Sequence, residues 1–178
     1  MKSETIEQAA LRYGPVNLVS RQWRHEARWM VICDVPPRIA SLWKNVASGR
    51  GMLTHRIYCN RDMVSPLTRA LSNILDAGLE RELKTFDGCY EIRACKGSIN
   101  VLSAHAYGLA IDLNAHENRP GQEPQLSPAL IQCWTSAGFD WGGNRPFKNG
   151  MHFSYAWEGN ASPLSSMLNA GLAPSHRA

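Results

Sequence analysis

The sequence lacks any apolar run long enough to cross a membrane. No stretch approaches the roughly eighteen consecutive apolar residues that a spanning helix needs. The first residues, MKSETIEQAALRYG, carry charges where a secretory signal peptide has its apolar segment. We therefore expect a protein that has no membrane partner and stays in the cytoplasm until something else releases it.

Cysteine is also scarce, and its spacing argues against two kinds of site. The five cysteines are an odd number with no C-x-x-C pair, a pattern that disfavours both a disulfide framework and a zinc knuckle. One alternative stays open, because Cys89 and Cys95 are near enough in sequence to meet across a hairpin. Otherwise we expect reduced, mostly buried thiols at positions 33, 59, 89, 95 and 133.

The positive charge is modest and scattered. Nineteen lysines and arginines against fifteen acidic residues give a net charge of +4 and a pI near 8.9. The basic residues form no stripe, which argues against a nucleic-acid partner. An anionic cell wall would suit the same charge.

Composition and length favour one globular domain over residues 1–178. Hydrophobic residues make up 44% of the 178 positions and charged residues 19%, and no repeat or linker divides the chain. We expect residues 1–60 to form an N-terminal helical portion packed on a core of residues 60–156. We also expect a monomer.

Both helical and strand patterns can be read along the chain. Ser65 and Ser127 each precede a proline, as an N-cap precedes the first residue of a helix. Helices are predicted at 3–14, 37–49, 65–78, 126–138 and 163–170. Strands are predicted at 27–36, 89–94, 108–114 and 151–157. With helices early and strands later, the expected fold is α+β, with helices on a small, mainly antiparallel sheet.

The stretch SAHAYGLAIDLN contains a carboxylate in an apolar strand. Asp112 would cost several kcal/mol to bury unpaired, so it needs a cation, a metal or a cage of hydrogen bonds. His105 precedes it by seven residues, and His152 begins a later strand that could lie beside it. Two histidines and one carboxylate are typical of a hydrolytic zinc site. The alternatives are a core histidine and an aspartate that accepts backbone N–H groups.

These residues resemble a known family. SAHAYGLAIDLN, followed by GFDWGGNRPFKNGMHF, is similar to the signature of VanY-type D-alanyl-D-alanine carboxypeptidases, whose relatives include L-alanyl-D-glutamate endopeptidases among phage endolysins. The positions that match the signature are Ser103, His105, Gly108, Ala110, Asp112, Trp141, Gly142, Gly143, His152 and Phe153.

The resemblance implies a zinc peptidase that cuts the stem peptide of bacterial peptidoglycan. It implies His105, Asp112 and His152 as the zinc ligands, with a water activated at the fourth position. Arg93, in the upstream DGCYEIRACKGS, would stabilise the developing oxyanion or hold a substrate carboxylate. Ser103 would contact the substrate, although a turn or cap role fits it equally. An endolysin would wait in the cytoplasm until the membrane is opened.

Asn149 departs from the family pattern. The family has an acidic general base three residues before the last histidine, and a neutral amide cannot accept a proton there. We expect zinc and substrate to bind while hydrolysis is severely slowed. Three explanations stay open: a deliberate Asp→Asn replacement, which we favour; a natural, non-catalytic protein that binds the cell wall or forms part of a virion; and partial deamidation at Asn149-Gly150.

Overall fold

The structure is a computed structural model that describes residues 12–14, 16–17, 20, 22–23, 26–49, 52–94 and 102–155. The predicted helix at 163–170, nearly all of the predicted helix at 3–14, and Cys95 lie outside these residues. The other four cysteines, at 33, 59, 89 and 133, are buried and free, as expected. No helix in the described part is both long and apolar enough to span a bilayer.

A six-stranded sheet carries the site. Its strands, in spatial order, are β5 (Met52–Leu53), β4 (Lys44–Asn45), β7 (Thr85–Gly88), β8 (Ala110–Leu113), β10 (His152–Tyr155) and β9 (Phe139–Trp141). Only β4 and β7 pair in parallel, and the other neighbours are antiparallel. The α+β class with a mainly antiparallel sheet is therefore confirmed.

Two smaller ribbons precede the motif-bearing strands. β1 (Val16–Asn17) pairs with β2 (Gln22–Trp23), and β3 (Met30–Asp34) pairs with β6 (Arg56–Asn60). The strand predicted at 27–36 is thus confirmed over its central residues, after the short helix α2 (Glu26–Trp29). Because several strands come this early, the predicted order of helices first and strands later is wrong.

The main helix, α4 (Arg61–Asp76), begins earlier than predicted. Its N-cap is Asn60, whose side chain accepts a hydrogen bond from the Asp62 N–H, and not Ser65. Pro66 therefore lies inside the helix, where it cannot donate a backbone hydrogen bond. The Asn60 cap and the burial of Met63 in the added turn offset this loss.

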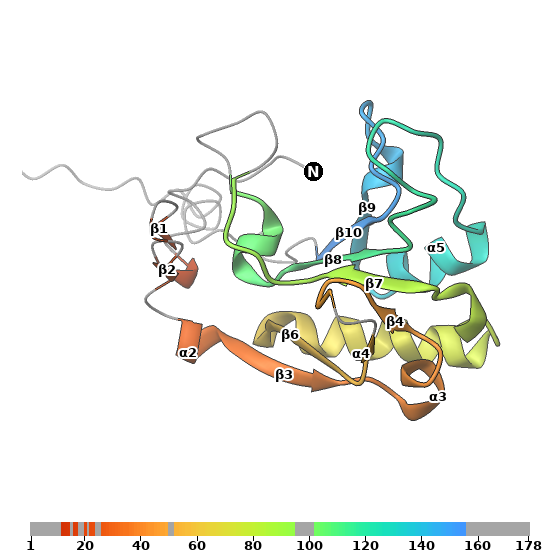
Figure 1. The fold of residues 1–178 in the computed structure, drawn as a ribbon, viewed down its shortest axis with the longest axis horizontal. Coiled ribbons are helices and arrows are strands. Elements are labelled where there is room, and N and C mark those ends of the chain that lie inside the picture. The colour runs from red at the N-terminus through yellow and green to blue at the C-terminus, as the bar shows by residue number, and fades with distance from the viewer. Residues whose placement is uncertain are drawn as a thin grey trace, which may run out of the picture.

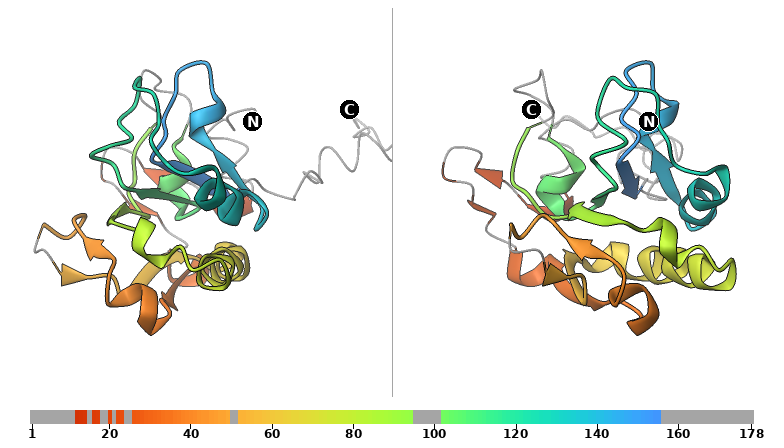
Figure 2. Two further views of the ribbon diagram at one scale, coloured as in Figure 1. Left: turned by 90° about the vertical axis from the view of Figure 1, so that its right-hand side faces the viewer. Right: turned by 45° about the vertical axis from the view of Figure 1, so that its right-hand side comes forward.

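Helix α5 (Pro128–Thr135) begins as predicted, since the Ser127 hydroxyl accepts a hydrogen bond from the Leu130 N–H. It packs against α4 (Figures 1 and 2). Three short 3-10 helices complete the elements of the described residues: η1 (Glu80–Glu82), η2 (Ala104–Tyr107) and η3 (Gly142–Asn144).

Two other predicted elements need correction. The helix expected at 37–49 stops as α3 (Pro37–Ala40), because Trp43 is fully buried and the next residues pair with β7 as strand β4. The strand expected at 89–94 lies earlier, as β7. The β7–β8 register shifts before Gly88, whose φ is 131°, and this irregularity ends the ladder.

The two faces of the sheet differ in chemistry. On β10, Phe153 points toward helix α5, where its ring centroid lies 5.3 Å from that of Trp134. Because side chains alternate along a strand, His152 and Ser154 occupy the opposite face. That face also carries Asp112 and Ala110, the β8 partners of His152 and Ser154. The polar face is covered by η2 and by the loop that joins β9 to β10.

Candidate metal centre

Asp112 and His152 are directly opposite each other on adjacent antiparallel strands. The His152 Nδ1 atom lies 2.9 Å from Asp112 Oδ1. Both residues are buried, with exposed fractions of 6% for Asp112 and 7% for His152. The structure thus places His152 on the strand beside Asp112, where the sequence predicted a third ligand.

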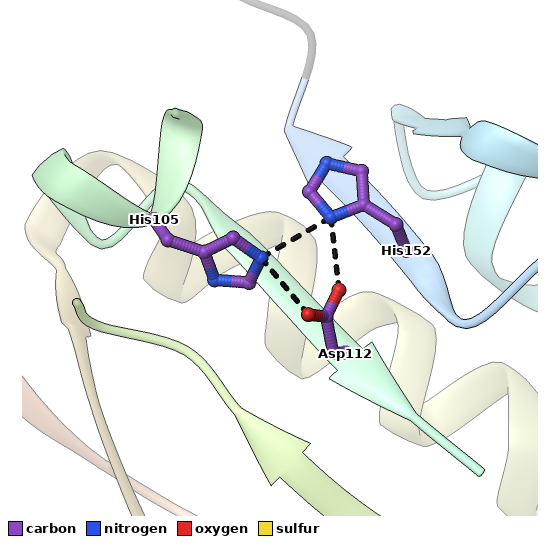
Figure 3. A group of neighbouring side chains, drawn as sticks. All are labelled: His105, Asp112 and His152. Carbon is purple, nitrogen blue, oxygen red and sulfur yellow. Dashed lines mark hydrogen bonds and ion pairs between the residues drawn. The ribbon is translucent and has the colours of Figure 1, made fainter. Parts of the chain in front are cut away.

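His105 reaches the same point from η2. Its Nε2 atom lies 3.2 Å from Asp112 Oδ2 and 3.1 Å from His152 Nδ1 (Figure 3). Gly108 makes the approach possible: its φ is +65°, and a Cβ there would lie 2.7 Å from Met30 Cε and 2.8 Å from the Asn60 nitrogen. The chain can therefore turn from η2 into β8 within a few residues.

A hydrogen bond on the far side of the His105 ring determines which ring nitrogen offers a lone pair to the site. His105 Nδ1 lies 2.7 Å from the backbone oxygen of Cys89. A carbonyl oxygen only accepts, so Nδ1 carries the hydrogen and a neutral His105 presents a lone pair at Nε2. That lone pair faces a carboxylate oxygen of Asp112 and a ring nitrogen of His152. A shared cation satisfies all three groups together.

The electrostatics agree with an ionised carboxylate at Asp112. Burial alone would raise the pKa of Asp112, but hydrogen bonds and charge interactions with His105 and His152 lower it well below its usual range. Burial lowers the pKa of His152 and outweighs the opposing effect of Asp112. The ligand atoms of His105, Asp112 and His152 lie within 4.8 Å of one another, which fits a bound metal ion.

Asn149 lies at the edge of this triad. A Cβ added at Gly142 would lie 3.3 Å from both the Asn149 Cβ and the His152 Cβ, so the two side chains start beside the same glycine. The Asn149 backbone is fixed by hydrogen bonds from its N–H to the Gly142 oxygen, at 3.0 Å, and from the His152 N–H to its own oxygen, at 3.2 Å. Its Oδ1 is buried and accepts no hydrogen bond from the described residues.

Trp141 has a packing role in the Trp-Gly-Gly segment. Its indole N–H donates a 2.8 Å hydrogen bond to the Gly150 oxygen, and its ring covers Gly143, where a Cβ would lie 2.2 Å from Trp141 Cζ2. These contacts hold the two ends of the loop that precedes His152. Close packing therefore explains both glycines of the segment: an added Cβ would collide with Trp141 at Gly143 and would crowd the Asn149 and His152 Cβ atoms at Gly142.

Arg93 and Ser103 are joined through the backbone, because the Ser103 N–H donates to the Arg93 oxygen at 3.1 Å. The Ser103 side chain is buried and caps η2 by accepting from the His105 N–H. The Arg93 side chain is 38% exposed, and its Nε–H donates to Glu91 at 2.9 Å. The structure brings Ser103 next to His105, whereas the charged partner of Arg93 is Glu91 and not a member of the triad.

Sequence reasoning missed two features of the site. The Cys89 carbonyl that orients His105 is a backbone group and has no signature in the sequence. Arg145 reaches over β10, where its Nη2 lies 3.4 Å from both Ser154 Oγ and Asp140 Oδ2. Alternation in HFSY could have indicated Ser154, which is two residues from His152 and so on the same face.

Residues 96–155 match a family model described as D-alanyl-D-alanine carboxypeptidase. This segment contains the triad, Ser103 and Asn149, while Arg93 lies just before it. The match supports the VanY-type resemblance and a peptidase-type activity on peptidoglycan. Searches among curated proteins and among solved structures gave no match.

Proposed function

We propose that this chain is a zinc-dependent peptidase whose substrate is the stem peptide of peptidoglycan. The observation that carries the proposal is the convergence of His105, Asp112 and His152 within a segment that matches the carboxypeptidase family. Zn²⁺ suits this donor set, because two imidazoles and one carboxylate leave a fourth position for water or substrate.

Each residue then has a defined task. A zinc ion held by the triad would lower the pKa of a water and polarise the scissile carbonyl. Cys89 fixes the His105 tautomer through its carbonyl oxygen, and Ser103 holds the start of η2. Arg93 would turn from Glu91 toward the oxyanion that develops on the substrate.

Asn149 limits the chemistry. In the proposed site it lies where a carboxylate would take a proton from the attacking water and return it to the leaving amine. Its amide oxygen can accept a hydrogen bond from that water but not its proton at neutral pH. General-base catalysis contributes about 10²–10⁴-fold, so hydrolysis by this chain should be slower by that order.

The same observation favours a second function, a non-catalytic protein that binds wall peptide. The buried Asn149 Oδ1, which has no hydrogen-bond donor among the described residues, would accept a hydrogen bond from bound peptide as readily as from water. Of the catalytic forms, we favour an endolysin-type enzyme that stays in the cytoplasm until the membrane is opened at lysis. The basic chain, with its net charge of +4, would then meet an anionic wall.

The substitution Asn149→Asp separates these functions. We would compare the zinc-loaded parent and variant for release of new amino groups from purified peptidoglycan, with Asn149→Ala as the control. A peptidase requires that the aspartate variant cut at least about a hundredfold faster than the parent. A variant that binds zinc and wall but stays silent would favour the binding protein.

A further inference from the structure

The paired strands β4 and β5, at one edge of the main sheet, expose a group of apolar side chains. In the described part of the chain, seven large hydrophobic side chains are exposed. Four of them, each exposed by 37% to 55%, lie on or beside these two strands: Leu42, Val46, Met52 and Leu53. Single exposed apolar side chains are ordinary, but a group of them marks a contact surface. We call these four residues the edge patch.

The strand register keeps the edge patch together. Leu53 is the direct partner of Lys44, so their side chains lie next to each other on one face. Val46 follows β4 and donates its N–H to the Phe86 oxygen at 3.0 Å, which holds it at the same edge. Met52 lies beside Leu53 on β5, the outermost strand of the sheet.

A cationic pocket adjoins the edge patch. It has a volume of about 360 Å³, and every charged side chain that lines it is positive. The lining residues are Leu42, Lys44, Arg81, Leu83, Lys84 and Thr85. Leu42 belongs to both the pocket and the patch, so the cations and the exposed apolar side chains form one continuous surface.

Two of the three cations have no anionic partner. Lys84 pairs with Glu117 at 3.0 Å. Lys44 and Arg81 are exposed, and neither forms a hydrogen bond or an ion pair with any described side chain. The acid that precedes Arg81 forms its ion pair with Arg38 instead. The pocket therefore keeps two positive charges that a ligand can neutralise.

Exposed aliphatic side chains beside unpaired cations suit the surface of an anionic lipid bilayer. Apolar side chains enter the boundary between headgroups and acyl chains, while lysine and arginine attract the lipid phosphates. Protein partners and single-stranded nucleic acids are usually held by aromatic side chains. Neither the edge patch nor the lining of the pocket contains an aromatic residue. The bilayer is therefore the partner that this chemistry favours.

We propose that the edge patch and the cationic pocket bind the surface of an anionic phospholipid bilayer. The phosphate of a lipid headgroup would lie between Lys44 and Arg81, and the four aliphatic side chains would enter the interface. Such a contact lies on the bilayer without crossing it, so it needs no spanning segment. It replaces our expectation of no membrane partner. It also goes beyond the proposed function, because it uses no residue of the metal site.

The test is sedimentation of the full chain with lipid vesicles. One vesicle preparation is phosphatidylcholine alone, and the other contains about one-third phosphatidylglycerol, which supplies the negative charge. The parent should bind the anionic vesicles at least about tenfold more tightly than the neutral ones. Each cation near an anionic surface changes the affinity about fivefold, so Lys44→Gln combined with Arg81→Gln should lower it about 25-fold.

Two further double variants separate the contributions. Arg61→Gln combined with Arg69→Gln removes the same charge from exposed positions on α4, outside the pocket, and should change the affinity less than about twofold, because salt screens distant charges. Met52→Gln combined with Leu53→Gln keeps every charge. It should weaken binding at least about tenfold, since burial of one such side chain contributes about that much.

Three results would overturn the bilayer contact. They are a parent that does not bind anionic vesicles, an equal loss of affinity in the α4 control, and full competition by a soluble single-stranded oligonucleotide, which offers phosphates without an apolar surface. Zinc content and the hydrolysis gained by Asn149→Asp should not change in the patch variants. These two measurements therefore test the proposed function separately from the bilayer contact.

Discussion

His105 Nδ1 lies 2.7 Å from the Cys89 carbonyl oxygen, and this contact leaves Nε2 as the nitrogen that faces Asp112 and His152. A backbone carbonyl therefore determines which lone pair enters the site. Metal-binding histidines are commonly oriented in this way by the group that binds their other nitrogen. The same contact ties the segment after β7 to η2, so the proposed metal ligands depend on a residue well outside their own motif.

We predict that the protein binds one equivalent of zinc and that His152→Ala abolishes this binding. Binding at a thousandfold excess over Kd adds about 4 kcal/mol to the free energy of unfolding, so a chelator should lower the melting temperature measurably. Elemental analysis and calorimetric melting, each with and without chelator, provide the measurements. The control is His55→Ala, since His55 is exposed and outside the triad. Retention of full zinc binding by the His152 variant would contradict the site.

Zinc affinity should fall as the pH falls below about 6.5, the ordinary pKa of histidine, because ligand histidines must be neutral. Asp112 should not contribute in this range, because its histidine partners hold its pKa well below the usual value. Burial also lowers the pKa of His152 in the folded chain. The unfolded chain therefore takes up that proton first, and the metal-free protein should lose stability as the pH falls below 6.5.

Competition titrations with a zinc indicator between pH 5 and 8 measure the first effect, and urea unfolding of the metal-free protein measures the second. The Asp112→Asn variant should bind zinc more weakly at every pH but keep the same dependence. An affinity that is flat across this range would exclude the two histidines as ligands.

Local chemistry predicted more of the site than of the fold. Asp112 can be picked out from the sequence, because a carboxylate in an apolar strand needs a partner. His105 and His152 can be picked out because they match the family signature. The cross-strand register that joins Asp112 to His152 could not be read from sequence, because it depends on which strands pair. The Cys89 carbonyl and the Arg145 guanidinium depend on loop geometry, which has still less signature.

The fold predictions failed where tertiary contacts override local pattern. Apolar residues recur at helical spacing after Pro37, at Ile39, Leu42, Trp43 and Val46. Of these only Ile39 lies in α3. Burial of Trp43 and pairing of the following residues with β7 outweigh that periodicity. At α4 the Ser-Pro pair is a strong start signal, but Asn60 supplies an earlier cap. The start of α5 at Ser127 was predicted correctly, because no other capping residue nearby competes with Ser127.

The corrected start of α4 is testable by paired cap substitutions. Asn60→Ala should lower the free energy of unfolding by about 1–2 kcal/mol, since it removes the cap and leaves the Tyr107 oxygen without the Asn60 amide donor. Ser65→Ala should change it by less than about 0.5 kcal/mol, because Ser65 is exposed inside the helix. Urea denaturation of both variants is the measurement. A larger loss for Ser65→Ala would restore the original prediction.

Gly108→Ala should weaken both the fold and the metal site. The substitution places a Cβ at a φ of +65°, which costs about 1–2 kcal/mol, and sets it 2.8 Å from the Asn60 nitrogen. Gly49→Ala is the matched control, since Gly49 has a φ of +64° but no atom within 4 Å of an added Cβ. The difference between the variants in unfolding free energy isolates the steric contact. Zinc affinity should fall only for Gly108→Ala, because the chain can relieve the steric contact of the added Cβ only by moving the turn that carries His105. Equal zinc affinity in the two variants would show that the turn does not position His105.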